Sequence, residues 1–137
     1  MKVMAMEKIY AFRLKPGEDL RNSIEAMVKE KSIAAGWIIT CTGSLSEYKI
    51  RFADRQGGTI GLGHFEIVGL VGTVSINGSH LHICISDSTG KTIGGHLLER
   101  CKIYTTAEII IGATSAYEFK RVRDEQTGWN ELEIKED

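Results

Sequence analysis

The chain has 137 residues, of which 42% are apolar and 26% charged, and its 17 Lys+Arg against 18 Asp+Glu leave a formal net charge of −1. This length predicts one domain, residues 1–137, with a core that needs no disulfides. The charge balance excludes the overall basic character of an autonomous DNA-binding domain, although local basic patches remain compatible with it.

The cysteines and the apolar segments indicate the compartment. Cys41, Cys84 and Cys101 are odd in number and include no CxxC pair, which is typical of buried free thiols in a reducing environment. The N-terminus lacks the apolar core of a signal peptide, and no apolar stretch approaches about 18 residues. We therefore expect a cytoplasmic protein that does not contact the membrane.

The first predicted elements are a strand and a helix. Residues 8–14 alternate in polarity and predict a strand, which Pro16 and Gly17 end. A helix is expected to open at Glu18 and to stop at Gly36. Its apolar face, which is expected to cover a sheet, is made of Leu20, Ile24, Met27 and Val28.

Strands dominate the middle of the chain. Two short strands are expected at 37–42 and 48–52, separated by a break at 43–46. A turn is expected at 54–58 and a long strand at 66–76. One face of that long strand is expected to consist of Val68, Leu70, Val74 and Ile76.

A hairpin follows the long strand. Asn77-Gly78 is the strongest short hairpin signal, and it joins that strand to residues 80–86. Residues 87–90 turn the chain again, and Gly94-Gly95 provides backbone freedom or close packing just before His96.

The last predicted elements allow the fold class to be assigned. Strands are expected at 102–111 and 117–122, and the acidic tail, 131–137, is expected to fray. One helix and many strands joined by short turns predict an α+β fold with a mainly antiparallel sheet, partly barrel-like, and one covering helix.

Three of the four histidines, His80, His82 and His96, lie within 17 residues. Alternation along a strand places His80 and His82 on one face, and the turn at 87–90 allows His96 to return to it. Three converging imidazoles predict a divalent-metal site, with zinc as the expected ion and a fourth position open to a water or ligand. The alternative is a set of half-buried histidines that are hydrogen-bonded to nearby backbone groups.

Other chemical groups near this segment have two interpretations each. Cys84 is a ligand or a core thiol, and Asp87 is an acceptor for an imidazole N–H or a turn residue. Glu108 is a second candidate acceptor, and His64 is either a solvated loop residue or a contact to a ligand or substrate. No nucleotide cradle and no GxSxG nucleophile motif is present, and the basic run 120–123 is expected to form a solvated strand face.

Ordered motifs along the chain match one known family. They are Arg13-Leu14-Lys15-Pro16-Gly17-Glu18-Asp19-Leu20, Gly43-Ser44-Leu45, Phe65-Glu66-Ile67, His80-Leu81-His82-Ile83, Ser86-Asp87, Gly90, Gly94-Gly95-His96-Leu97 and Tyr104-Thr105-Thr106-Ala107-Glu108. With these motifs nearly the whole chain resembles the plant and prokaryote conserved (PPC) domain. That domain is joined to AT-hook motifs in land plants and usually stands alone in bacteria and archaea.

The resemblance implies a compact α/β domain that assembles as a homotrimer. It also implies DNA binding, because prokaryotic members carry a DNA-binding label that comes from their plant relatives. This chain, however, has no AT-hook, and it has His64 at the position where the plant sequences resemble Gly-Arg-Phe-Glu-Ile with an Arg. His80, His82 and His96 fall on matching histidines, and in some prokaryotic relatives this cluster resembles a metal site.

Three hypotheses follow. The first is a homotrimeric, stand-alone PPC protein associated with DNA. The second is a zinc-dependent enzyme acting on a small molecule at the three histidines, with Glu108, or second to it Glu66, as candidate general base. The third is a trimer with a structural metal or with no metal chemistry.

Overall fold

The computed structural model describes residues 6–136 and contains, in this range, one helix and eight strands. The helix, α1, spans Leu20–Glu30. The strands are β1 (Lys8–Leu14), β2 (Gly36–Arg51), β3 (Thr59–Val74), β4 (His80–Ser86), β5 (Thr92–Leu97), β6 (Lys102–Ala113), β7 (Tyr117–Arg123) and β8 (Asn130–Glu136).

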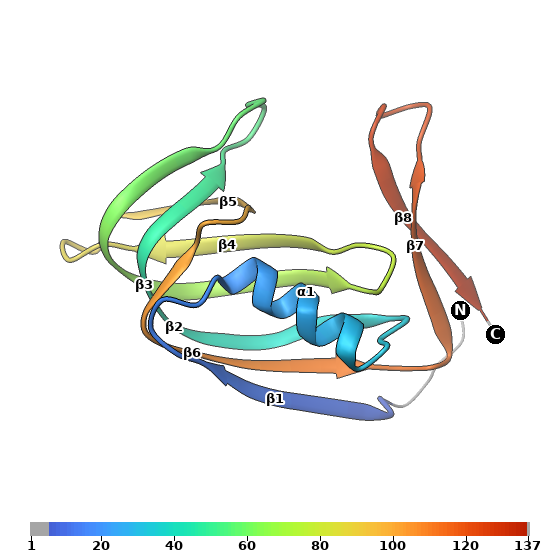
Figure 1. Cartoon of the computed structure of the whole chain (residues 1–137). Coiled ribbons are helices and arrows are strands. Elements are labelled where there is room, and N and C mark those ends of the chain that lie inside the picture. The colour runs from blue at the N-terminus through green and yellow to red at the C-terminus, as the bar shows by residue number, and fades with distance from the viewer. Residues whose placement is uncertain (1–5, 137) are drawn as a thin grey trace.

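Six of the strands form one antiparallel sheet in the order β1-β6-β2-β3-β4-β5. The end of β2 also pairs with β5, so β2, β3, β4 and β5 close into a ring (Figure 1). The predicted fold class is therefore confirmed: the sheet is mainly antiparallel and nearly closed, and it carries one short helix.

Helix α1 lies across the sheet and ends earlier than the sequence predicted (Figure 1). Asp19 caps its N-terminus by accepting a hydrogen bond from the Asn22 N–H. The expected stop at Gly36 is wrong, because Ser32 already adopts a left-handed backbone (φ 52°) and Gly36 is the first residue of β2. The predicted apolar face is buried at three positions, Leu20, Ile24 and Val28.

Strand β2 is continuous, so the predicted break at 43–46 is wrong. The backbone of β6 passes so close to Gly43 that a Cβ atom would collide with the Thr106 carbonyl oxygen. Glycine at this position therefore permits close strand packing and does not end the strand. A register shift between Gly43 and Leu45 absorbs the irregularity.

The predicted apolar face of the long strand is also wrong in part. Leu70 and Val74 are buried, but Val68 is 57% exposed and Ile76 is 49% exposed. A bulge between Ile67 and Gly69 takes Val68 out of the alternation, which has a period of two, and Ile76 lies beyond Val74, the last residue of β3.

The C-terminal segment forms a second, two-stranded sheet, and the expected fraying of the tail is wrong for its described residues, 131–136. Strand β8 pairs with β7 along its whole length. The hairpin is attached to the main sheet because the Phe119 N–H donates to the Ala34 carbonyl, and Ser75 and Asn77 both donate to the Phe119 carbonyl. Asp137 lies outside the described residues.

Among residues 6–136, α1 is too short and too polar to cross a lipid bilayer.

Candidate metal centre

Strands β4 and β5 bring the three predicted histidines together. On β4, Leu81, Ile83 and Ile85 face the core, so His80 and His82 project from the opposite face. His96 on β5 lies directly opposite His82 in the antiparallel register. The predicted convergence of the three imidazoles is confirmed.

The three rings are close and are not engaged by neighbouring groups. Ring centroids are 4.8 Å apart for His80 and His82, 4.4 Å for His82 and His96, and 5.4 Å for His80 and His96. No hydrogen bond joins any of these imidazoles to another described residue, so the alternative of histidines satisfied by backbone groups finds no support within residues 6–136.

The donor atoms fit a small cation after modest adjustment. One nitrogen from each ring can be chosen so that all three lie within 4.8 Å of one another. In a tetrahedral zinc site such nitrogens are about 3.3 Å apart, given zinc–nitrogen bonds of about 2.05 Å. Because His80 and His82 are exposed, their side chains are free to rotate by the small amount required.

The electrostatic environment favours the neutral, ligating form of two of the imidazoles. Partial burial of the otherwise exposed ring lowers the pKa of His80, and the neighbouring His82 and Arg121 lower it further, while the Glu131 carboxylate opposes them. Burial also lowers the pKa of His96, with the Arg51 guanidinium as the next cause. Neutral imidazole is the form that binds metals, so both shifts favour coordination near neutral pH.

The cluster opens into a hollow of about 620 Å³ beside the ring of strands. His80 and His96 form one wall, Arg51 at the end of β2 forms another, and hairpin β7–β8 contributes Arg121 and Glu131. Trp129 completes the rim, 65% exposed, with the Arg51 guanidinium 5.6 Å from its ring centre.

Sequence reasoning missed Arg51, Arg121, Trp129 and Glu131 as neighbours of the histidines. Arg51 lies opposite His96 only because β2 pairs with β5. Arg121 was expected on a solvated strand face and Glu131 in a frayed tail. No local pattern marks these residues, since they meet the cluster through contacts between distant segments.

The structure does not bring the predicted acidic partners to the cluster. Glu108 lies exposed on β6, opposite Arg13 on β1 and Thr42 on β2. Glu66 pairs with Ser86 at the far end of β4. Neither residue belongs to the histidine group within residues 6–136.

Asp87 is a turn residue, which was one of the two interpretations of this side chain. Its carboxylate accepts hydrogen bonds from the Thr89 N–H, the Thr89 hydroxyl and the Lys91 N–H. The hydrogen bond from the Thr89 hydroxyl is the main cause that lowers the pKa of Asp87, and the two backbone N–H donors lower it further. The carboxylate therefore stabilises the turn between β4 and β5 that returns His96 to His82.

His64 stands apart from the other histidines and lies within β3, so its expected place in a loop is wrong. Its ring stacks on Tyr104 with centroids 4.0 Å apart and planes 8° from parallel. The pair lines a separate hollow of about 350 Å³ together with Glu66 and Asp87.

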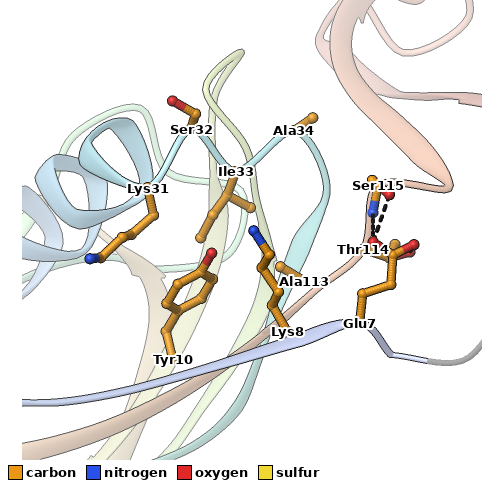
Figure 2. A pocket seen from close by; sticks show the side chains of 10 residues that line it. All are labelled: Glu7, Lys8, Tyr10, Lys31, Ser32, Ile33, Ala34, Ala113, Thr114 and Ser115. Carbon is orange, nitrogen blue, oxygen red and sulfur yellow. Dashed lines mark hydrogen bonds between the residues drawn. The ribbon is translucent and has the colours of Figure 1, made fainter.

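A further hollow, of about 210 Å³, lies where the start of β1 meets the turn after α1 and the end of β6 (Figure 2). In it the Glu7 carboxylate accepts hydrogen bonds from the N–H and hydroxyl of Ser115. The side-chain hydrogen bond from Ser115 is the main cause that lowers the pKa of Glu7. The Glu7 carboxylate is therefore already satisfied, and it joins the residue before β1 to the segment after β6.

The three cysteines are free thiols in the structure. Burial raises the pKa of Cys41 to about 12 and that of Cys101 to about 11, so both thiols stay protonated. Cys84 lies on the same face of β4 as His82 but does not join the histidine group.

Comparison with known proteins identifies one family. Residues 1–115 match the Plants and Prokaryotes Conserved (PCC) domain, the family abbreviated PPC above. The chain is also 41% identical over 127 residues to the Bifunctional protein GlmU of Synechococcus sp. (strain JA-2-3B'a(2-13)), a match that covers 93% of this chain. The chain spans only 20% of the length of that relative.

Solved structures agree with the fold. A hypothetical protein from Salmonella cholerae-suis is 36% identical, with a TM-score of 0.93 over 97% of each chain. A metal-containing protein from Archaeoglobus fulgidus is 29% identical, with a TM-score of 0.80 over 97% of this chain and 99% of its own. A Bacteroides thetaiotaomicron protein described as DNA-binding is 24% identical, with a TM-score of 0.79 over 94% and 96%, and supports the fold alone.

Proposed function

The chain belongs to the Plants and Prokaryotes Conserved domain family, and from this premise we propose that it holds a divalent transition metal, preferably zinc, between His80, His82 and His96 and uses it on a small molecule. The observation that carries the proposal is the convergence of three imidazoles that no described residue engages by a hydrogen bond. Imidazoles in this state are good ligands for zinc and related ions.

Two further observations support a metal. A relative with the same fold and 29% identity, from Archaeoglobus fulgidus, is a metal-containing protein. The lowered pKa values of His80 and His96 favour the deprotonated form of both rings, which is the form that coordinates a metal.

The open side of the cluster favours a working site over a purely structural one. Structural zinc sites are closed by four protein ligands, whereas three ligands and a free position are typical of catalytic sites. The described residues offer three ligands, and the space beside them is a hollow of about 620 Å³, within the usual range for a small-molecule site. When bound, such a metal supplies Lewis-acid chemistry, which polarises a carbonyl or phosphoryl oxygen.

The surrounding residues have distinct tasks. The Glu131 carboxylate influences His80 electrostatically and is a suitable acceptor for its non-ligating N–H, which would fix the ring orientation. Trp129 and hairpin β7–β8 border the hollow on one side. Glu131 therefore takes, in this proposal, the part that the sequence suggested for Glu108.

We also propose that the protein is a homotrimer, as its family resemblance implies. Strand β3 carries a row of apolar side chains with no cover in the protomer: Leu62 is 78% exposed, Val68 57% and Val71 62%. An uncovered apolar surface of this kind is typical of a subunit interface. Val71 lies directly opposite His82 on β4, so such an interface would pass close to the metal site.

Metal analysis of protein purified without a His-tag tests the site. We expect close to one equivalent per chain, and we expect His82→Ala to lose it, because removal of one of three ligands leaves too few donors. The matched control is His64→Ala, which removes a histidine that stacks on Tyr104 and lies outside the cluster. Light scattering of the same samples is expected to show a trimer for all three proteins.

Less than about a tenth of an equivalent in the unmodified protein would contradict the metal site, which requires near-stoichiometric binding. A monomer in light scattering would contradict the trimer alone. If His82→Ala lost both metal and assembly, the metal would be structural.

A further inference from the structure

We propose that the hollow beside the three histidines binds a small anionic molecule, through a carboxylate or phosphate group held by Arg51 and Arg121 next to the metal. This names the ligand class for the site described above and therefore rests on the proposed metal function.

The two arginines line the hollow without a carboxylate partner. Within residues 6–136, neither Arg51 nor Arg121 has an acidic oxygen within 4.0 Å, whereas Arg21, Arg100 and Arg123 all form ion pairs. Both side chains are half-buried, so each guanidinium has lost part of its hydration without forming a direct ion pair in return, although the Glu131 carboxylate acts on Arg121 from a greater distance. Burial accordingly lowers the pKa of Arg121.

Each guanidinium is also held in place and keeps donors to spare. Arg121 donates from Nη2 to the Thr73 hydroxyl at 2.8 Å, and Arg51 donates from Nη1 to the Arg55 carbonyl at 3.2 Å. A guanidinium has five N–H donors, so most of them remain available to a ligand. Two guanidinium forks of this kind match pairs of oxygen atoms on carboxylate and phosphate groups.

The charge of the lining favours an anion once metal is present. Asp54 and Glu131 also border the hollow, and they balance the two arginines when the histidines are neutral. A divalent metal would leave a net charge of about +2 in the site. A ligand that brings negative oxygens to both the metal and the arginines would neutralise this charge.

The size and rim of the hollow fit an organic anion. Its volume of about 620 Å³ exceeds what a lone inorganic ion requires. Trp129 presents an exposed ring at the rim, beside Arg51, on which a flat part of the ligand can stack.

Calorimetric titration of zinc-loaded, desalted protein tests the proposal, with inorganic phosphate and malonate as separate probes. We expect saturable binding of at least one probe, with a dissociation constant of about 1 mM or tighter. Binding of phosphate alone assigns the phosphate group, binding of malonate alone assigns the carboxylate, and binding of both assigns their shared oxyanion chemistry. Quenching of Trp129 emission, absent in Trp129→Phe, is expected to accompany binding.

Arginine variants locate the contact. We expect Arg51→Gln and Arg121→Gln to weaken probe binding at least about tenfold, since each loses charge-assisted hydrogen bonds to the anion. The controls are Arg55→Gln and Arg123→Gln, which remove neighbouring arginines that do not line the hollow and which are expected to bind normally. Arg121→Lys retains the charge but not the planar fork, and is expected to bind with intermediate affinity.

The zinc content of every variant separates the two proposals. If zinc is bound but neither probe binds, or if all four Gln variants weaken binding equally, the anion site is overturned and the metal site stands. If no zinc is retained by the unmodified protein, the metal site itself is overturned. Melting temperatures within a few degrees of the unmodified protein verify that the variants are folded.

Discussion

At the scale of single residues, the chemistry of the site depends on imidazoles that stay neutral. His80 and His96 both have a lowered pKa because burial and nearby cationic groups disfavour a positive charge on the ring. A lowered pKa favours the neutral imidazole that binds a metal. In the metal-free protein, the same lowered pKa makes stability depend on pH, because protonation of these rings is disfavoured in the folded state.

This sensitivity leads to a pH prediction for the metal-free protein. The folded-state pKa of His80 and His96 lies below the unfolded value of about 6.5, so the unfolded chain binds more protons once the pH falls below about 7. The stability contribution of the neutral rings is therefore present above pH 6.5 and is lost as the pH falls through the folded-state pKa.

We expect the melting temperature of chelator-treated protein to fall between pH 7.5 and pH 5.5. The fall should be smaller in the variant His80→Gln/His96→Gln, which lacks both titrating rings, and unchanged in His64→Gln, whose histidine lies outside the cluster. Equal falls in all three proteins, measured by calorimetry, would contradict the assigned cause.

At the scale of elements, glycines allow the strands to pack closely enough to close the ring. Gly95 on β5 lies against the end of β2, where a Cβ atom would come within 2.5 Å of the Arg51 carbonyl oxygen. The pairing of β2 with β5 also places Arg51 opposite His96. A single glycine therefore connects closure of the ring with construction of the site.

Replacement of this glycine tests the connection. We expect Gly95→Ala to lower the free energy of unfolding by about 1–3 kcal/mol, because the added methyl group forces β2 and β5 apart. We also expect weaker zinc binding, because His96 moves with β5. The control is Gly57→Ala in the turn before β3, where nothing lies within 4 Å of the added atom and little change is expected.

Urea unfolding and zinc titration measure the two effects. An unchanged free energy of unfolding in Gly95→Ala would show that the ring of strands accommodates the added methyl group. Lost stability with full zinc affinity would show that closure of the ring and the position of His96 are independent.

At the scale of the whole molecule, the charge distribution bears on DNA binding. The densest basic run, residues 120–123, lies on β7. In the register of the hairpin, Lys120 lies opposite Glu133 and Glu118 lies opposite Lys135 on β8. Basic and acidic side chains therefore alternate across this hairpin, and a duplex would meet both signs of charge.

We expect no saturable binding of a 20-base-pair duplex at about 50 mM salt, measured by fluorescence polarisation. Binding that weakens steeply as salt increases would contradict this expectation, because such a slope counts phosphate contacts. In that event a trimer that gathers basic groups from three chains would be the explanation to test next.

Several features of the protein follow from the sequence alone. The first strand was predicted with its observed bounds, 8–14, and Asn77-Gly78 joins β3 to β4 as expected. Alternation correctly placed His80 and His82 on one face of their strand, and ordered motifs identified the family that residues 1–115 match. These features depend on short-range geometry or on motif order, both of which are visible in one chain.

The tertiary structure alone decided which distant residues meet. The continuity of β2, the bulge after Ile67 and the closure of β2 onto β5 set the register that brings Arg51 to His96. The hairpin β7–β8, whose second strand was expected to fray, supplies Arg121, Trp129 and Glu131 to the same hollow. Local patterns specify which face a side chain takes, but the register between strands depends on packing among segments far apart in the chain. The sequence therefore located the three histidines. The tertiary structure determined which residues surround them, and the proposed metal and anion sites depend on those residues.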